Sequence, residues 1–74
     1  MKIRLSTIDK VKEFVALTTK QDCYMDLVSG RYIIDAKSIM GIFSLDLSKP
    51  IDFVVHLDGE EKEKVESLFT EYKA

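Results

Sequence analysis

The clearest strand pattern in this 74-residue chain is IDFVVHLD, at residues 51–58. Every second side chain from Ile51 to Leu57 is apolar, and the positions between them carry one aspartate, one valine and the only histidine. Successive side chains of a β-strand point to opposite faces of its sheet, so this alternation predicts a strand with one covered face. Gly59 ends the pattern. Other elements must therefore pack against one side of the sheet.

Two segments have the three- and four-residue spacing of apolar side chains that is typical of amphipathic helices. One begins after Ser6 or Thr7, whose hydroxyls can cap a helix, and Asp9 adds a favourable charge to its first turn. The other runs from Glu60 to Lys73. The predicted core positions of the two helices are Ile8, Val11, Phe14, Val15, Thr18, Val65, Leu68, Phe69 and Tyr72. Both helices are of the kind that covers a sheet.

The remaining elements are short. Residues 2–5 alternate polar and apolar side chains, and so do residues 22–28, which lead through Ser29-Gly30 into a returning strand at 32–34. An apolar helix is expected over residues 38–43, with Asp35 as its cap. The order is therefore strand, helix, strand, strand, helix, strand, helix.

This order predicts an α+β fold in a single domain, residues 1–74. Four strands with helices on one face make a two-layer, open-faced sandwich. The sheet is expected to be antiparallel, because the short connection between two of its strands is a hairpin and because the strand at 51–58 alternates cleanly. A chain this short supports one core.

Composition excludes several classes of function. Eleven Lys and Arg against 13 Asp and Glu give a net charge of -2, without the basic footprint of a nucleic-acid binder. The single cysteine, Cys23, has no partner for a disulfide, and no His or Cys cluster predicts a metal or other cofactor. No stretch has the length and apolar character of a signal peptide or membrane span, so a cytoplasmic protein without a membrane partner is expected.

The segment IDAKSIMGIFSL, at residues 34–45, resembles the regulatory-serine segment of HPr, the phosphocarrier of the bacterial sugar phosphotransferase system. Its core, KSIMG, is the most specific part of the match. The predicted order of elements is also that of HPr over essentially the whole chain. The resemblance implies a four-stranded antiparallel sheet with three helices on one side, the HPr-like βαββαβα arrangement.

The other signature of HPr is missing. Where HPr-like carriers have Gly-x-His-Ala-Arg-Pro, this chain has LSTIDKV, at residues 5–11. Ser6 and Thr7 occupy this degenerate phosphohistidine region, and a phosphate ester on a hydroxyl is too stable to pass onward as a phosphohistidine does. The resemblance therefore predicts a noncatalytic protein rather than an enzyme or an ordinary carrier.

Ser38 falls where HPr carries its regulatory phosphoserine. A phosphate at the start of the second helix would add roughly -1.5 to -2 charges beside exposed N–H groups, which the helix dipole tolerates. Ser38 is thus a candidate for phosphorylation by an HPr-kinase-like enzyme, with Lys37 beside it. The alternative is that Ser38 only caps the helix.

Ile39, Met40 and Phe43 match positions that form an apolar docking surface in HPr. Because Ile39 and Met40 are adjacent on a helix, both cannot point into the core, which favours a partly exposed interaction surface over complete burial. With Lys37, these residues are the predicted partner-binding set. The expected partner is a phosphotransferase-system enzyme, an HPr-kinase-like enzyme or a transcriptional regulator.

Two further functions stay open. One is an unconventional phosphocarrier that receives phosphate at His56 or a hydroxyl, although His56 is expected on the outer face of the sheet without a positioning arginine. The other is a structural remnant of a larger system. Cys23 is interpreted as a small apolar side chain, and the acidic stretch at residues 60–63 as a solvated helix start rather than a cation site.

Overall fold

The computed structural model describes all 74 residues and shows the predicted order of elements. These elements are β1 (Lys2–Ile3), α1 (Ile8–Thr18), β2 (Met25–Ser29), β3 (Tyr32–Asp35), α2 (Ile39–Phe43), β4 (Ile51–Val55), α3 (Gly59–Ser67) and a short 3-10 helix, η1 (Thr70–Tyr72). The α+β class and the βαββαβα order are thus confirmed.

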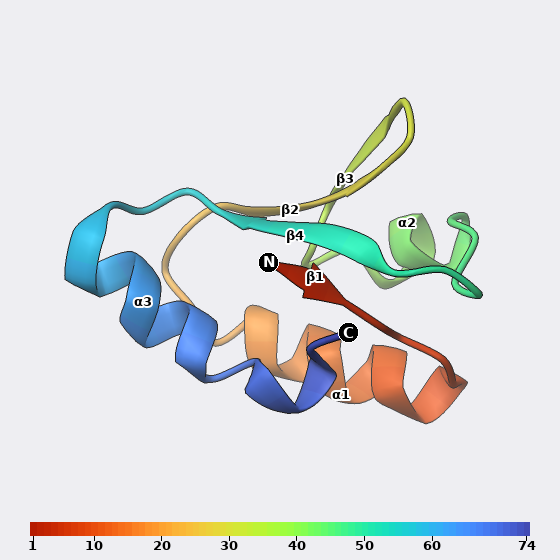
Figure 1. Ribbon diagram of the computed structural model, residues 1–74. Coiled ribbons are helices and arrows are strands. Elements are labelled where there is room, and N and C mark those ends of the chain that lie inside the picture. The colour runs from red at the N-terminus through yellow and green to blue at the C-terminus, as the bar shows by residue number, and fades with distance from the viewer.

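The strands form one antiparallel sheet in the order β1-β4-β2-β3. β4, the strand of the opening pattern, lies in the interior of this sheet, with Phe53 opposite Leu27 of β2 and Ile51 opposite Ile3 of β1. Its side chains alternate between buried and exposed along the whole strand, as predicted. The helices lie on one side of the sheet (Figure 1), so the open-faced sandwich is confirmed.

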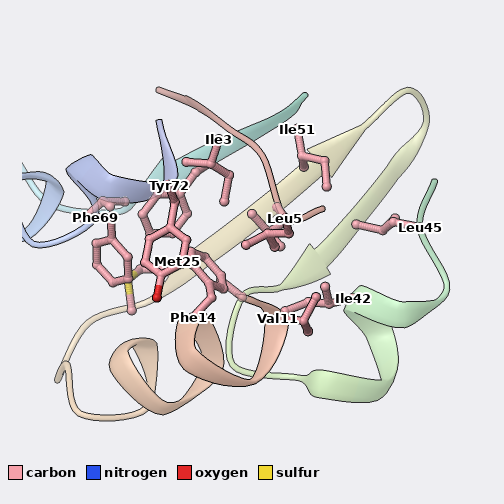
Figure 2. Close-up of a cluster of buried hydrophobic side chains, with 14 residues drawn as sticks. Ile3, Leu5, Val11, Phe14, Met25, Ile42, Leu45, Ile51, Phe69 and Tyr72 are labelled. Atoms are coloured by element: carbon pink, nitrogen blue, oxygen red, sulfur yellow. The ribbon is translucent and has the colours of Figure 1, made fainter. Parts of the chain in front are cut away.

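One cluster of 14 buried apolar side chains fills the space between sheet and helices. Phe14 of α1 lies at its centre, with ring centroids 5.3 Å from Phe53, 5.4 Å from Phe69 and 5.5 Å from Tyr72. Edge-to-face and tilted arrangements at such distances are favourable contacts between aromatic rings. Figure 2 shows that Ile3, near the start of the chain, and Tyr72, near its end, both lie in this cluster.

Three expectations about the helices are wrong: the burial of Ile8, the length of the last helix and the burial of Leu68. Ile8, the first residue of α1, is 63% exposed, because it lies at the end of the helix where the core no longer covers it. The last helix is also shorter than predicted, since α3 ends at Ser67. Leu68 is consequently 48% exposed, whereas Phe69 and Tyr72 reach the core from the turn and from η1.

The β2–β3 hairpin turns at Gly30 and Arg31, since Ser29 and Tyr32 are paired. Gly30 has φ +59°, a left-handed conformation that glycine adopts without strain, and glycine at the first position of a two-residue turn is typical of type II′ hairpins. The predicted turn is confirmed with a shift of one residue. None of the helices combines the length and the apolar character needed to cross a membrane.

Candidate functional site

Ser38 is the N-cap of α2. Its backbone is extended, with φ -99° and ψ 103°, and its Oγ accepts a hydrogen bond from the Gly41 N–H at 3.2 Å. The expectation that Asp35 caps this helix is wrong. The Asp35 carboxylate instead accepts the Lys37 N–H at 2.9 Å, because the chain makes a separate turn between β3 and α2. Ser38 is half-buried, and no acidic residue lies in the first turn of α2.

Lys37 is held by a contact that the sequence does not reveal. Its Nζ donates a hydrogen bond to the Gln21 carbonyl at 2.7 Å, and the residue is half-buried. Gln21 belongs to the turn after α1, so this bond ties the start of α2 to the end of α1. The fold therefore fixes the position of the ammonium at the turn after α1.

The apolar side chains of α2 divide between two faces. Ile42 is completely buried, and Ile39 is half-buried against the core. Met40 is 78% exposed and Phe43 is 41% exposed. Residues three apart lie on the same face of a helix, so Met40 and Phe43 are neighbours on the surface. The expectation that Ile39 and Met40 point in different directions is confirmed.

The close packing around position 41 explains why the KSIMG segment has a glycine there. A Cβ at this position would lie 2.5 Å from Cγ2 of Ile34 and 3.1 Å from the Oγ of Ser38. α2 thus approaches β3 so closely that no side chain fits between them. The close packing fixes the orientation of α2, and with it the outward direction of Met40 and Phe43.

The degenerate phosphohistidine region has a different character. Ser6 is exposed, and Thr7 is the N-cap of α1, with its Oγ1 accepting the Lys10 N–H at 3.1 Å. The predicted hydroxyl cap is thus confirmed, with Thr7 in that position. Asp9 lies in the first turn of α1 and adds a negative charge there.

His56 lies on the outer face of the sheet, as predicted, but it has a partner. Its Nε2 is 2.6 Å from Oδ2 of Asp26, on the neighbouring strand β2, and both side chains are partly exposed. The sequence did not indicate this pair, because a separation of 30 positions says nothing about strand register. Cys23 is half-buried and packs against the core, in agreement with its interpretation as an apolar side chain.

A polar cleft of about 500 Å³ lies away from these residues. It is formed by the β2–β3 turn, the loop between α2 and β4, and β1. Within that loop, the hydroxyl and backbone N–H of Ser48 both bond to Asp46 and lower its pKa, with a smaller contribution from Lys49. None of the predicted site residues lines this cleft.

The structure thus places Met40 and Phe43 on one short helix, with Ser38 as its N-cap and Lys37 just before it. Comparisons of the chain with models of protein families, with curated proteins and with solved structures found no significant match. The resemblance to HPr therefore depends on the residues quoted for it and on the order of the elements.

Proposed function

We propose that this protein is a noncatalytic regulatory or adaptor protein related to HPr, which docks a protein partner through α2. The observation that carries the proposal is the exposure of Met40 and Phe43 on a helix whose other side is packed into the core. Large apolar side chains exposed side by side are a common feature of protein-binding surfaces. The expected partner is a phosphotransferase-system enzyme, an HPr-kinase-like enzyme or a transcriptional regulator in the bacterial cytoplasm.

Phosphorylation of Ser38 is the second part of the proposal. Ser38 starts α2, where backbone N–H groups and the helix dipole favour negative charge, and the first turn carries no acid. Met40 and Phe43 follow within one and a half turns, so a phosphate here would alter the edge of the docking surface. Phosphorylation would thereby change which partner binds.

The proposal is tested by intact-mass spectrometry after incubation with HPr kinase and ATP, with an ordinary HPr as the positive control. We expect one added phosphate on the wild type and on Thr7→Ala, and none on Ser38→Ala. Absence of phosphate on the wild type, beside a phosphorylated HPr control, contradicts the regulatory role of Ser38.

Docking is tested with the same kinase by measuring kcat/KM for phosphorylation. Met40→Asp should lower kcat/KM by about tenfold or more, because a charge would be placed in an apolar contact. Tyr24→Asp is the matched control, since Tyr24 is 85% exposed and lies outside α2. An unchanged kcat/KM for a folded Met40→Asp variant argues against α2 as the docking surface for the kinase.

A second candidate function, phosphate transfer through His56, is favoured by one observation. The Asp26 carboxylate at 2.6 Å from Nε2 can hold the imidazole in the tautomer that leaves Nδ1 free to accept a phosphoryl group. We expect no phosphate from phosphoenolpyruvate and Enzyme I, because no ion pair or side-chain hydrogen bond joins a lysine or arginine to His56 or Asp26 to help bind the incoming anion. Acid-labile phosphate that disappears in His56→Ala would favour this second function over the first.

A further inference from the structure

The two outer strands of the sheet differ in how their free edges are covered. Along β1, the Arg4 N–H donates to the Tyr72 carbonyl at 2.8 Å, and the Ala74 N–H donates to the Lys2 carbonyl at 3.0 Å. The C-terminal residues therefore close this edge. β3 is paired with β2 alone, and the hairpin projects from the body of the domain (Figure 1). An open edge strand offers its backbone groups to another chain.

The register of the hairpin determines which groups face this open edge. Ser29 pairs with Tyr32 across the two-residue turn, and the Ala36 N–H donates to the Met25 carbonyl at 2.9 Å. Hydrogen bonding alternates along an antiparallel ladder, so the even-numbered residues of β3 bond to β2. The N–H and C=O of Ile33 therefore point away from β2, and so does the Asp35 N–H.

The side chains along this edge are unusually apolar for an exposed strand. Tyr32 is 68% exposed and Ile33 is 69% exposed. Proteins commonly protect an edge strand with a proline, an inward-pointing charge, a lysine or a β-bulge. β3 contains no proline or lysine, and its pairing with β2 runs from Tyr32 to Asp35 without a bulge.

We propose that β3 pairs antiparallel with β3 of a second copy of this chain, with Ile33 opposite Ile33. The two four-stranded sheets would then form one continuous sheet, and the two Ile33 residues would exchange their backbone hydrogen bonds. Ile33 would also contact its own counterpart on the outer face. The association involves no residue of α2 and is independent of the proposed function.

The charges that flank the paired residues are complementary in this register, because Arg31 lies in the hairpin turn just before β3 and Asp35 is the last residue of β3. The Arg31 side chain of each copy would lie near Asp35 of the other, so two ion pairs would flank the two-fold axis. One Asp35 oxygen already accepts the Lys37 N–H, which leaves the other for this contact. Tyr32 meets Ile34 of the second copy on the inner face. A shift by two residues would place Asp35 opposite Ile33 instead and would lose both ion pairs.

The size of this contact predicts a weak dimer. Stable interfaces commonly bury about 1,200–2,000 Å², and a pairing of the four residues of β3 in each chain is well below this range. We therefore expect a dissociation constant on the order of 0.1–1 mM. The dimer should be visible at the concentrations used in NMR spectroscopy and should dissociate on dilution.

The first test follows self-association by sedimentation equilibrium and by amide hydrogen exchange over a wide concentration range. We expect a monomer–dimer equilibrium in which protection of the Ile33 amide rises with concentration. Ile33→Lys should raise the dissociation constant by about tenfold or more, because it places two like charges opposite each other. Tyr24→Lys, an exposed control away from β3, should not change it. A wild type that stays monomeric, or an Ile33→Lys variant whose dissociation constant equals that of the wild type, overturns the proposal.

The second test addresses the register with charge reversal. Arg31→Glu alone should weaken self-association, because the new carboxylate would face Asp35 of the second copy. Asp35→Lys alone should weaken it as well, because the new ammonium would face Arg31. A mixture of the two variants should associate again, since every cross-pair then joins opposite charges. Each variant is first checked for native circular dichroism. Two folded variants that fail to associate when mixed contradict this register.

Discussion

The first turns of α1 and α2 have the same local construction but different surroundings. Thr7 and Ser38 each accept the N–H of the residue three positions later, at 3.1 Å and 3.2 Å. The bond at Thr7 is exposed to solvent, whereas the bond at Ser38 is partly buried. Asp9 lies in the first turn of α1, and no acid lies in that of α2.

This difference shows that a capping hydroxyl at the start of a helix does not by itself indicate a regulatory phosphorylation site. Thr7 caps an ordinary amphipathic helix, and the one large apolar residue exposed beside it is Ile8. Ser38 begins a helix that is packed closely on β3 and presents Met40 and Phe43 to solvent. The surroundings, rather than the cap, make α2 the better candidate for a site.

The largest change in stability that tests this difference between α1 and α2 is expected at Gly41. Gly41→Ala should lower the free energy of unfolding, because overpacking costs about 1–3 kcal/mol and exceeds the ~1 kcal/mol that alanine gains over glycine in a helix. The contact responsible is the one with Cγ2 of Ile34. Urea unfolding of the purified variant measures the change.

The Ile34→Ala background provides the control for this prediction. Without the isoleucine side chain, the added Cβ has room, so Gly41→Ala should become neutral or stabilising there. This reversal of sign is a coupling between two residues in contact, which a double-mutant cycle isolates. An equal loss of stability in both backgrounds would mean that close packing against β3 is not the reason for the glycine.

A smaller change in stability is expected when either capping side chain is removed. Loss of a capping side chain costs about 0.5–2 kcal/mol. We expect Ser38→Ala near the upper end and Thr7→Ala near the lower end, because water can reach the Lys10 N–H more easily than the Gly41 N–H. Urea unfolding measures both. Ser38→Asp, which keeps an accepting oxygen, should recover most of the loss. Equal costs at the two positions would mean that the partial burial of the Ser38 cap does not strengthen it.

The smallest expected effect concerns the ionisation of Tyr72 in η1. Burial raises the pKa of the Tyr72 hydroxyl above 10.0, and the negative charges of Glu71 and then Glu13 raise it further. The folded state therefore favours the neutral phenol, so this contribution to stability is complete below about pH 10 and is lost as pH rises through the pKa of the folded protein.

The measurement is urea unfolding at a series of pH values from about 9 upward. Tyr72→Phe has no phenol to ionise and should lose stability less steeply over this range than the wild type. Identical slopes for the two proteins would show that Tyr72 titrates alike in the folded and unfolded states.

The surroundings of α2 could be predicted only in part. Adjacency of Ile39 and Met40 required that they diverge, and the structure confirms it. The contact of Gly41 with Ile34 and the bond from Lys37 to Gln21 join residues from different elements, and no spacing in the sequence indicates them. The same holds for Asp26 and His56, whose pairing depends on the register of β2 and β4.

The errors at the helix ends have a related cause. Periodicity continues smoothly through Leu68 to Tyr72, yet α3 ends at Ser67. The final residues leave the helix and pair instead with β1, where the backbone of Tyr72 and Ala74 finds partners. Hydrophobic spacing indicates which side chains are buried and not whether the backbone that carries them is helical. It therefore predicts the burial of Phe69 and Tyr72 correctly and the extent of the helix wrongly.

By itself, the sequence determined the order of the elements, the α+β class and the buried face of β4, because these depend on side-chain periodicity within single segments. It also required Ile39 and Met40 to lie on different sides of their helix, without determining which of the two is exposed. Tertiary structure alone decided the open edge of β3, the partner of His56 and the close approach at Gly41. Each of these depends on how two distant segments meet, and that is set by the packing of the whole chain around one shared core.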